Sequence, residues 1–365
     1  MFEKMAKIAV NYSLGVKKGN RVLIRGPDLA KELILALYAE VLKVGAHPFI
    51  RIELEGEEEI FYELASDDQL TYTDELLIHM IKEFDSLIAI RADFNTRYLA
   101  DVDSEKIKKK LGSEGLKRYR KIMEERVKKG ELNWVLIPFP CQAYAQDADM
   151  GLHSYTKFIE KSIFLDKDDP IKEWKKIRER QEKLVKELEK FEKIEIIGKD
   201  TNLTMSVKGR KWINCCGDKN LPDGEIFTGP VEDSVNGKIR FTYPAIRYGQ
   251  EVQNIFLEFK DGKVINSSAA KGEAFLKDYL TIENADRIGE FAIATNYGIQ
   301  RFTKNILFDE KIGGTLHCAL GFGFKETGSK NEAAVHWDFI KDMKVEGSKV
   351  LGDGKIIYEE GKWKL

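Results

Sequence analysis

Cysteine and histidine are both scarce in this chain of 365 residues, which contains four cysteines and five histidines. Four cysteines, two of them adjacent at Cys215 and Cys216, do not make a disulfide framework in a chain of this length, and no pair has CxxC spacing. A reducing compartment is therefore expected. With so few histidines, each one can be weighed separately as a possible ligand or base.

Net charge and long apolar runs are also missing. The 59 Lys and Arg residues nearly cancel the 61 Asp and Glu residues, so no basic field favours nucleic acid or an anionic membrane. No stretch approaches the roughly 18 apolar residues of a membrane span, and the lysine-bearing start of the chain lacks the apolar core of a signal peptide. We expect a cytoplasmic protein that binds neither nucleic acid nor membranes, and the abundance of Lys and Glu is compatible with a thermophilic source.

The first half of the chain alternates strand and helix patterns. Short β-like runs at Arg21–Arg25 and Pro48–Ile52 flank a helical pattern over Leu29–Val44. Two more runs, at Ser86–Ile90 and Trp134–Phe139, each follow a helical segment. Such alternation predicts an α/β domain with a mainly parallel sheet covered by helices.

The pattern changes after a highly charged helix predicted over Pro170–Lys193. Beyond it stand hairpin-type dipeptides, which are absent before residue 195: Asp223-Gly224, Asn236-Gly237, Asp261-Gly262 and Asp353-Gly354. We therefore predict an α/β domain over 1–195, with the charged connector helix at its end. An α+β, β-rich antiparallel domain follows over 196–365, with one helical insert near Gly272–Glu283.

Two histidines of the second half stand in informative surroundings. In His336-Trp337-Asp338, a strand would place the imidazole and the carboxylate on the same face, which suits a metal, although such a pair is more often a surface hydrogen bond. His317 lies in an apolar, glycine-bounded segment and is either a core residue or a ligand.

Three glutamates have similarly apolar neighbours, namely Glu225, Glu290 and Glu310. Each either faces water at a strand end or needs a buried partner, because an unpaired buried charge is very costly. Together with Asp338 they make four carboxylates beside two imidazoles, and four negative charges would balance two divalent cations. A two-metal hydrolase requires such a mixed set.

The segments that carry these residues resemble, in the correct order, the motifs of the aminopeptidase T family, the leucyl aminopeptidase-like thermophilic metallo-aminopeptidases. The resemblance covers most of the chain, and an N-terminal motif over Trp134–Ala145 extends it. The matching segments are Asn220–Ser234, Arg287–Glu290, Leu307–Glu310, His317–Gly321 and His336–Asp338.

The resemblance implies a metal-dependent aminopeptidase that removes N-terminal residues from peptides through a dinuclear site with a bridging water. It implies that two divalent ions (Zn, Co or Mn) bind at Glu225, Glu290, His317, His336 and Asp338, with Glu290 as the bridge and Glu310 as a further ligand. It also implies a homodimer that takes short peptides with a free N-terminus. Glu232 is a candidate proton carrier to the leaving amine, its alternative being a turn or interface charge.

The chain departs from the family pattern in two places. The spacing from Glu310 to His317 is longer than in bacterial members, which concerns the ligand role of Glu310. The chain also has Phe324 where the family pattern includes a tyrosine, which keeps a second interpretation open. A non-catalytic or weakly active member that binds peptides is therefore the alternative. A nucleotide-binding enzyme, suggested by Gly321, Gly323 and Gly328, fits poorly because these glycines lack both the fingerprint spacing and its strand–helix context.

Overall fold

The computed structural model describes residues 1–247 and 249–365, and these form two compact units. The first unit comprises Met1–Glu160, Leu165–Ile171 and Gly217–Leu221, and the second comprises Lys161–Phe164, Lys172–Cys216 and Pro222–Leu365. Among the described residues, no helix is both long and apolar enough to cross a membrane.

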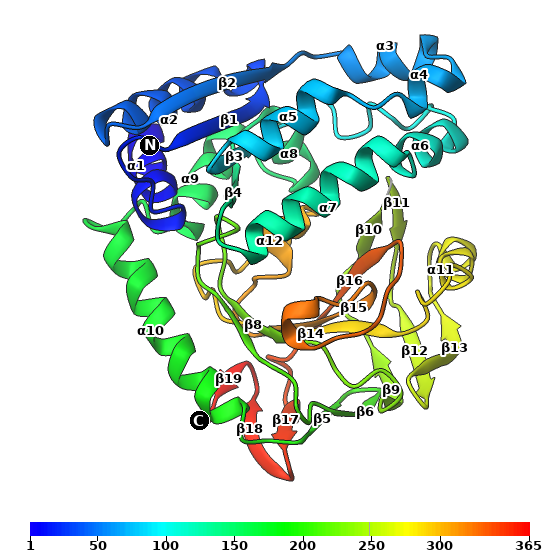
Figure 1. The fold of residues 1–365 in the computed structure, drawn as a ribbon. Helices are drawn as coiled ribbons and strands as arrows, with labels where there is room; N and C mark the ends of the chain where they lie inside the picture. Colours follow the sequence, from blue (N-terminus) through cyan, green and yellow to red (C-terminus); the bar gives the residue numbers. More distant parts are fainter. Residues whose placement is uncertain (248) are drawn as a thin grey trace. The chain divides into compact units, whose positions relative to one another are not determined.

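A four-stranded parallel sheet organises the first unit (Figure 1). The strand order is β2-β1-β3-β4, and the strands are β1 (Arg21–Pro27), β2 (His47–Glu53), β3 (Ser86–Arg91) and β4 (Asn133–Pro138). Buried Val22 and Ile24 of β1 alternate with residues of the opposite face, while α2 (Lys31–Lys43) buries Leu33, Leu37 and Val41 on one stripe. The predicted parallel α/β sheet is thus confirmed.

The remaining helices of this unit connect or extend the sheet. They are α1 (Phe2–Lys7), α3 (Glu57–Leu64), α4 (Asp67–Thr71), α5 (Glu75–Glu83), α6 (Ser104–Leu111), α7 (Glu114–Lys128), α8 (Gln142–Asp147) and α9 (Leu152–Ser162), with a π-helical turn at Ile8–Ser13 and a 3-10 turn at Asp28–Ala30. Several begin at side-chain caps, as where Asp74 accepts hydrogen bonds from the backbone N–H groups of Leu76 and Leu77 at the start of α5.

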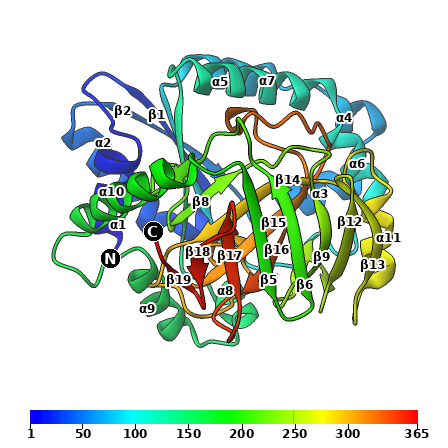
Figure 2. The same cartoon turned by 90° about the horizontal axis from the view of Figure 1, so that it is seen from below.

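Antiparallel sheets build the second unit. An eight-stranded sheet has the order β13-β12-β9-β6-β5-β17-β18-β19, and Figure 2 shows its strands side by side from β18 to β13. Its strands are β5 (Lys193–Gly198), β6 (Thr201–Ser206), β9 (Asn236–Arg240), β12 (Phe256–Lys260), β13 (Lys263–Ser268), β17 (Lys349–Gly352), β18 (Lys355–Glu359) and β19 (Lys362–Trp363).

A second, five-stranded sheet has the order β16-β15-β14-β8-β7. It consists of β7 (Ile213–Cys215), β8 (Glu225–Thr228), β14 (Ile288–Ala294), β15 (Thr315–Gly321) and β16 (His336–Asp342), and the two short strands β10 (Ala245–Arg247) and β11 (Gln250–Val252) pair separately. Two short helices, α11 (Glu273–Leu280) and α12 (Ile306–Asp309), and a 3-10 turn at Lys325–Thr327 complete the unit. The predicted helical insert is α11.

Only two of the four hairpin-type dipeptides form hairpin turns. Asp261-Gly262 joins β12 to β13 and Asp353-Gly354 joins β17 to β18, each with positive φ at both residues, as a tight hairpin requires. Asn236-Gly237 instead lies inside β9, where a Cβ on Gly237 would stand 2.1 Å from the carbonyl oxygen of Asn202. Asp223-Gly224 precedes β8 and is part of the site described below.

The charged helix α10 (Pro170–Leu188) belongs mainly to the second unit, whereas the predicted boundary near residue 195 assigned it to the first. Leu184 and Leu188 are buried in the same hydrophobic cluster as Ile194 of β5 and Ile357 of β18. The helix therefore belongs to the second unit because its apolar stripe packs into the core of that unit, and its charged side chains do not determine this.

The packing of the second unit predicts unequal costs for two similar truncations. Leu257→Ala in β12 removes a fully buried side chain and should lower the free energy of unfolding by about 2–5 kcal/mol. Ile265→Ala in β13, where the side chain is 58% exposed, should cost less than about 0.5 kcal/mol. Urea unfolding followed by circular dichroism checks both, and equal losses would contradict the packing.

Candidate metal centre

The five-stranded sheet gathers acidic and histidine side chains on one of its faces. Ala319 of β15 is opposite Glu290 of β14 on one side and Asp338 of β16 on the other, so all three share a face. His317 and His336 lie two residues before Ala319 and Asp338 on their own strands and therefore share it too. The strand placement predicted for His336-Trp337-Asp338 is confirmed.

Glu225 joins the same face from β8, because it is opposite Ala294, which lies four residues after Glu290 on β14. A bulge at Gly289 between Ile288 and Glu290 adjusts the register of β14 just before the glutamate. A Cβ at Gly289 would meet the carbonyl oxygen of Gly321 at 2.3 Å, so only glycine fits there. The sheet thus supplies five of the six residues that the sequence predicted as ligands.

Glu310 arrives from a different element, directly after the last residue of α12. It is partly buried and lies in one potential metal-ligating group with His317 and Asp338. Glu225, Glu290 and His317 are almost fully buried, at 4%, 5% and 1% exposure. The structure therefore brings all six predicted ligands together.

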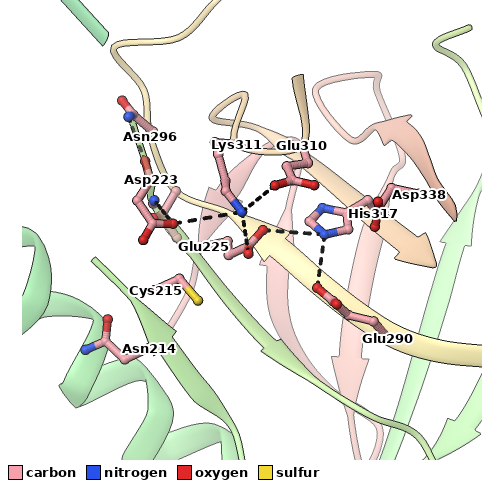
Figure 3. A network of polar contacts seen from close by, with 12 residues as sticks. Asn214, Cys215, Asp223, Glu225, Glu290, Asn296, Glu310, Lys311, His317 and Asp338 are labelled. Carbon is pink, nitrogen blue, oxygen red and sulfur yellow. Dashed lines mark hydrogen bonds and ion pairs between the residues drawn. The ribbon is translucent and has the colours of Figure 1, made fainter. Parts of the chain in front are cut away.

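Glu290 stands between the two imidazoles (Figure 3 shows it beside His317). Its Oε1 lies 3.4 Å from Nε2 of His317, and its Oε2 lies 3.5 Å from Nε2 of His336. Nε2 of His317 is also 3.4 Å from Oε2 of Glu225, and Nε2 of His336 is 3.4 Å from Oδ1 of Asp338. One carboxylate thus faces two adjacent sets of ligand atoms.

The unsatisfied atoms of the cluster fit bound cations. Buried Oε2 of Glu225, Nδ1 of His317 and Oδ1 of Asp338 have no hydrogen-bond partner among the described residues. Nδ1 of His336 lies 2.8 Å from the carbonyl oxygen of Phe322, an orientation that leaves Nε2 free to bind a metal. Mixed imidazole and carboxylate ligands suit Zn, Co or Mn better than Mg or Ca. The residues present therefore fit a metal centre.

The charges of the cluster shift the pKa values of its members strongly. Burial disfavours a charged imidazole, but Glu225 and Glu290 outweigh it and raise the pKa of His317 to about 9. In the same way Asp338 and Glu290 raise the pKa of His336 to about 10. Burial opposes ionisation of Asp338 as well, yet His336 lowers the pKa of this carboxyl well below its usual value.

Lys311 is a member of the cluster that sequence reasoning missed. Its side chain is 1% exposed, and its Nζ lies 2.5 Å from Oε1 of Glu225, 2.8 Å from Oε1 of Glu310 and 3.9 Å from Oδ1 of Asp223. Burial alone would lower the pKa of Lys311, but these carboxylates raise it well above the usual value. The available signal was a lysine directly after a predicted ligand, in a segment whose charged residues Asp309, Glu310 and Lys311 have apolar residues on both sides.

Glu232 has a different environment from the predicted ligands. Its Oε2 lies 2.6 Å from Nη2 of Arg210, and its Oε1 accepts hydrogen bonds from the backbone N–H of Lys330 and the hydroxyl of Ser329. Burial would raise its pKa, but these contacts outweigh it and lower the pKa. No potential metal-ligating group among the described residues includes Glu232. Its contacts connect its own loop to two others.

Phe324 stands close to the cluster. Its ring centroid lies 5.4 Å from the ring centroid of His336 and 5.4 Å from that of Phe227, both in edge-to-face arrangements. An apolar ring without a hydroxyl group therefore flanks His336.

Comparison with known proteins decides the family. Residues 1–363 match the family described as thermophilic metalloprotease (M29). The chain belongs to this family. It is accordingly a metal-dependent peptidase, and the buried His and carboxylate cluster of this metalloprotease is its candidate metal centre.

The relatives match along nearly the whole chain. Aminopeptidase 2 from Geobacillus stearothermophilus is 26% identical, over 99% of this chain and 97% of its own length. Aminopeptidase T from Thermus thermophilus is 25% identical, over 99% of this chain and 98% of its own length. The solved structure of wild-type AmpT from Thermus thermophilus superposes with a TM-score of 0.86 at 24% identity, covering 100% of this chain and 99% of that chain. This superposition confirms the predicted fold class.

The metal centre predicts a cation-dependent gain in thermal stability. Adding Zn²⁺, Co²⁺ or Mn²⁺ to chelator-dialysed protein should raise the unfolding midpoint, because a cation bound only by the native state adds about 2.7 kcal/mol at a hundredfold excess over its Kd. Differential scanning fluorimetry measures the shift. His336→Ala should lose most of it, and His153→Ala, at an exposed position, should keep it. An undiminished shift in His336→Ala would contradict the assignment.

Proposed function

We propose that this metalloprotease is an aminopeptidase that acts on short peptides with a free N-terminus through two divalent metal ions. The position of Glu290 carries the proposal, because its two carboxylate oxygens face two different histidines. The relatives named as aminopeptidases support it, since their similarity extends over 97–98% of their own lengths.

Two overlapping groups of ligands would hold the ions. Glu225, Glu290 and His317 form one group, and Glu290, His336 and Asp338 form the other. Glu290, present in both, is the proposed bridge, and Glu310 is a further ligand on the side of His317 and Asp338. When bound, the two ions would polarise the scissile carbonyl, activate a bridging water and anchor the substrate amino group.

The histidine and carboxylate ligands must be deprotonated so that their lone pairs can bind the metal ions. Both imidazoles must lose a proton before they ligate, and the neighbouring carboxylates raise their pKa values, so protons would compete with the metal ions. The Nδ1 contact of His336 fixes the orientation of its ring, and Lys311 fixes Oε1 of Glu225, so that Oε2 points toward His317.

A homodimer and a cytoplasmic location belong to the same proposal and rest on the family resemblance. Size-exclusion chromatography with light scattering tests the first. The alternative of a non-catalytic peptide-binding member, suggested by Phe324, is an outcome of the activity measurement below.

Glu290→Ala should abolish both metal retention and peptidase activity. We expect hydrolysis of leucine p-nitroanilide to fall by more than about 100-fold, since loss of partners outside the ligand shell already costs 10–100-fold. Inductively coupled plasma mass spectrometry measures the bound metal in the same samples. Glu179→Ala, on the exposed surface of α10, is the matched control.

A blocked substrate tests the requirement for a free amino group. The wild-type protein should leave N-acetyl-leucine p-nitroanilide uncut under conditions in which it cleaves the unblocked compound. Activity that survives full chelation or Glu290→Ala would exclude the two-metal scheme. Metal binding without any hydrolysis would instead favour the non-catalytic alternative.

Glu232→Gln distinguishes the proton carrier from a loop contact. The ties to Arg210 and Lys330 favour the second role, so kcat should stay within about tenfold of the wild type while the unfolding midpoint falls. Loss of a general acid or base costs about 10²–10⁴-fold. A loss of that size at unchanged metal content would restore Glu232 as the proton carrier.

A further inference from the structure

Potential metal-ligating residues extend beyond the two proposed ion positions in a connected row, in which neighbouring groups share a residue. Beyond the groups that contain His317 or His336, Cys215, Asp223 and Glu225 form a further group, called the third group because it would hold a third ion. In it one potential ligand atom from each residue lies within 4.8 Å of the others. Cys215 of β7 is opposite Glu225 of β8 in the sheet, and Asp223 comes two residues before Glu225. Glu225 therefore belongs both to this third group and to the proposed ion position at His317.

Lys311 faces this same end of the row (Figure 3). Its Nζ lies 2.5 Å from Glu225 and 3.9 Å from Asp223, and Cys215 is among the groups that act on it electrostatically. The ammonium group is almost fully buried and approaches carboxylates on three sides, the third being that of Glu310 at 2.8 Å. A positive charge thus already lies beside two of the three residues of this group.

The count of charges agrees with this arrangement. The connected row contains five carboxylates, on Asp223, Glu225, Glu290, Glu310 and Asp338. Two divalent ions supply four positive charges, and the Lys311 ammonium supplies a fifth. Buried carboxylates without counter-charge are very costly, so the lysine completes the neutralisation.

We propose that the Lys311 ammonium takes the place of a third cation at Cys215, Asp223 and Glu225, and thereby limits the row to two metal ions. The inference rests on the two-metal function proposed above. An ammonium group is a compact charge that donates hydrogen bonds and has no orbital to accept from a thiolate, so it neutralises the acids without recruiting Cys215 as a ligand. It also holds Oε1 of Glu225, which leaves Oε2 for the proposed ion at His317.

Metal stoichiometry of Lys311→Met tests the proposal. Without the ammonium, a thiolate-seeking cation should bind at the third group, so we expect one more equivalent of Cd²⁺ per chain in the variant than in the wild type. Isothermal titration calorimetry with Cd²⁺ counts the ions, and the ultraviolet charge-transfer absorption of a Cd–thiolate bond reports whether Cys215 takes part. Neither readout depends on peptidase activity.

Two further variants test whether the charge of Lys311 excludes the third ion, rather than some other effect of changing this residue. Lys311→Arg keeps the charge and should bind the same number of ions as the wild type. In the double variant Lys311→Met/Cys215→Ser the additional equivalent and its thiolate absorption should both disappear. The other cysteines, Cys141, Cys216 and Cys318, are present throughout and serve as the internal control.

An equal Cd²⁺ count in folded Lys311→Met and wild type would overturn the proposal. If Lys311→Met does not fold, the wild-type protein still tests the proposal. We expect Cd²⁺ to give no thiolate absorption from Cys215 in the wild type. An absorption in the wild type that is lost in Cys215→Ser would show that the lysine does not exclude the metal. The wild-type count separately tests the proposed function. Fewer than two ions there would contradict the two-metal scheme, whereas the difference between variant and wild type concerns Lys311 alone.

Discussion

The second unit depends on one electrostatic constraint, namely that carboxylates gathered in a nearly water-free place need positive charge beside them. Glu225 and Glu290 are about 95% buried. Two imidazoles of raised pKa and the ammonium group of Lys311 lie beside them and supply the positive charge. Metal ions would displace protons from the imidazoles but would leave the lysine in place. The cluster therefore contains one buried ammonium group, and in the proposed two-metal site protons and metal ions would compete for the two imidazoles.

Much of the scaffold could be predicted from the chain alone. Alternating strand and helix patterns indicated the parallel sheet, because burial on both faces of such a sheet leaves short apolar runs at Arg21–Arg25 and Ser86–Ile90. Local patterns failed where packing decided the outcome. The dipeptide Asn236-Gly237 resembles a hairpin turn, yet Gly237 lies in β9 because the backbone of Asn202 approaches it closely.

The candidate ligands were found through the order of their motifs, since no single histidine or glutamate was distinctive by itself. His336 and Asp338 came closest, because strand spacing alone places them together. Lys311 could not be recognised in this way. A lysine in the sequence is ordinarily a solvated charge, and only the folded chain shows that Glu225, Glu310 and Asp223 surround it.

The bulge at Gly289 decides which way the proposed bridging residue points. Residues two apart on a strand normally share one side, yet Ile288 is opposite Leu320 on the core side of the sheet while Glu290 is opposite Ala319 on the other side. One additional residue in the strand reverses the side, so that Ile288 stays in the core while Glu290 faces the histidines. A side chain at position 289 would collide with the carbonyl oxygen of Gly321, so any other residue there would disturb the local register that aims Glu290 at the histidines.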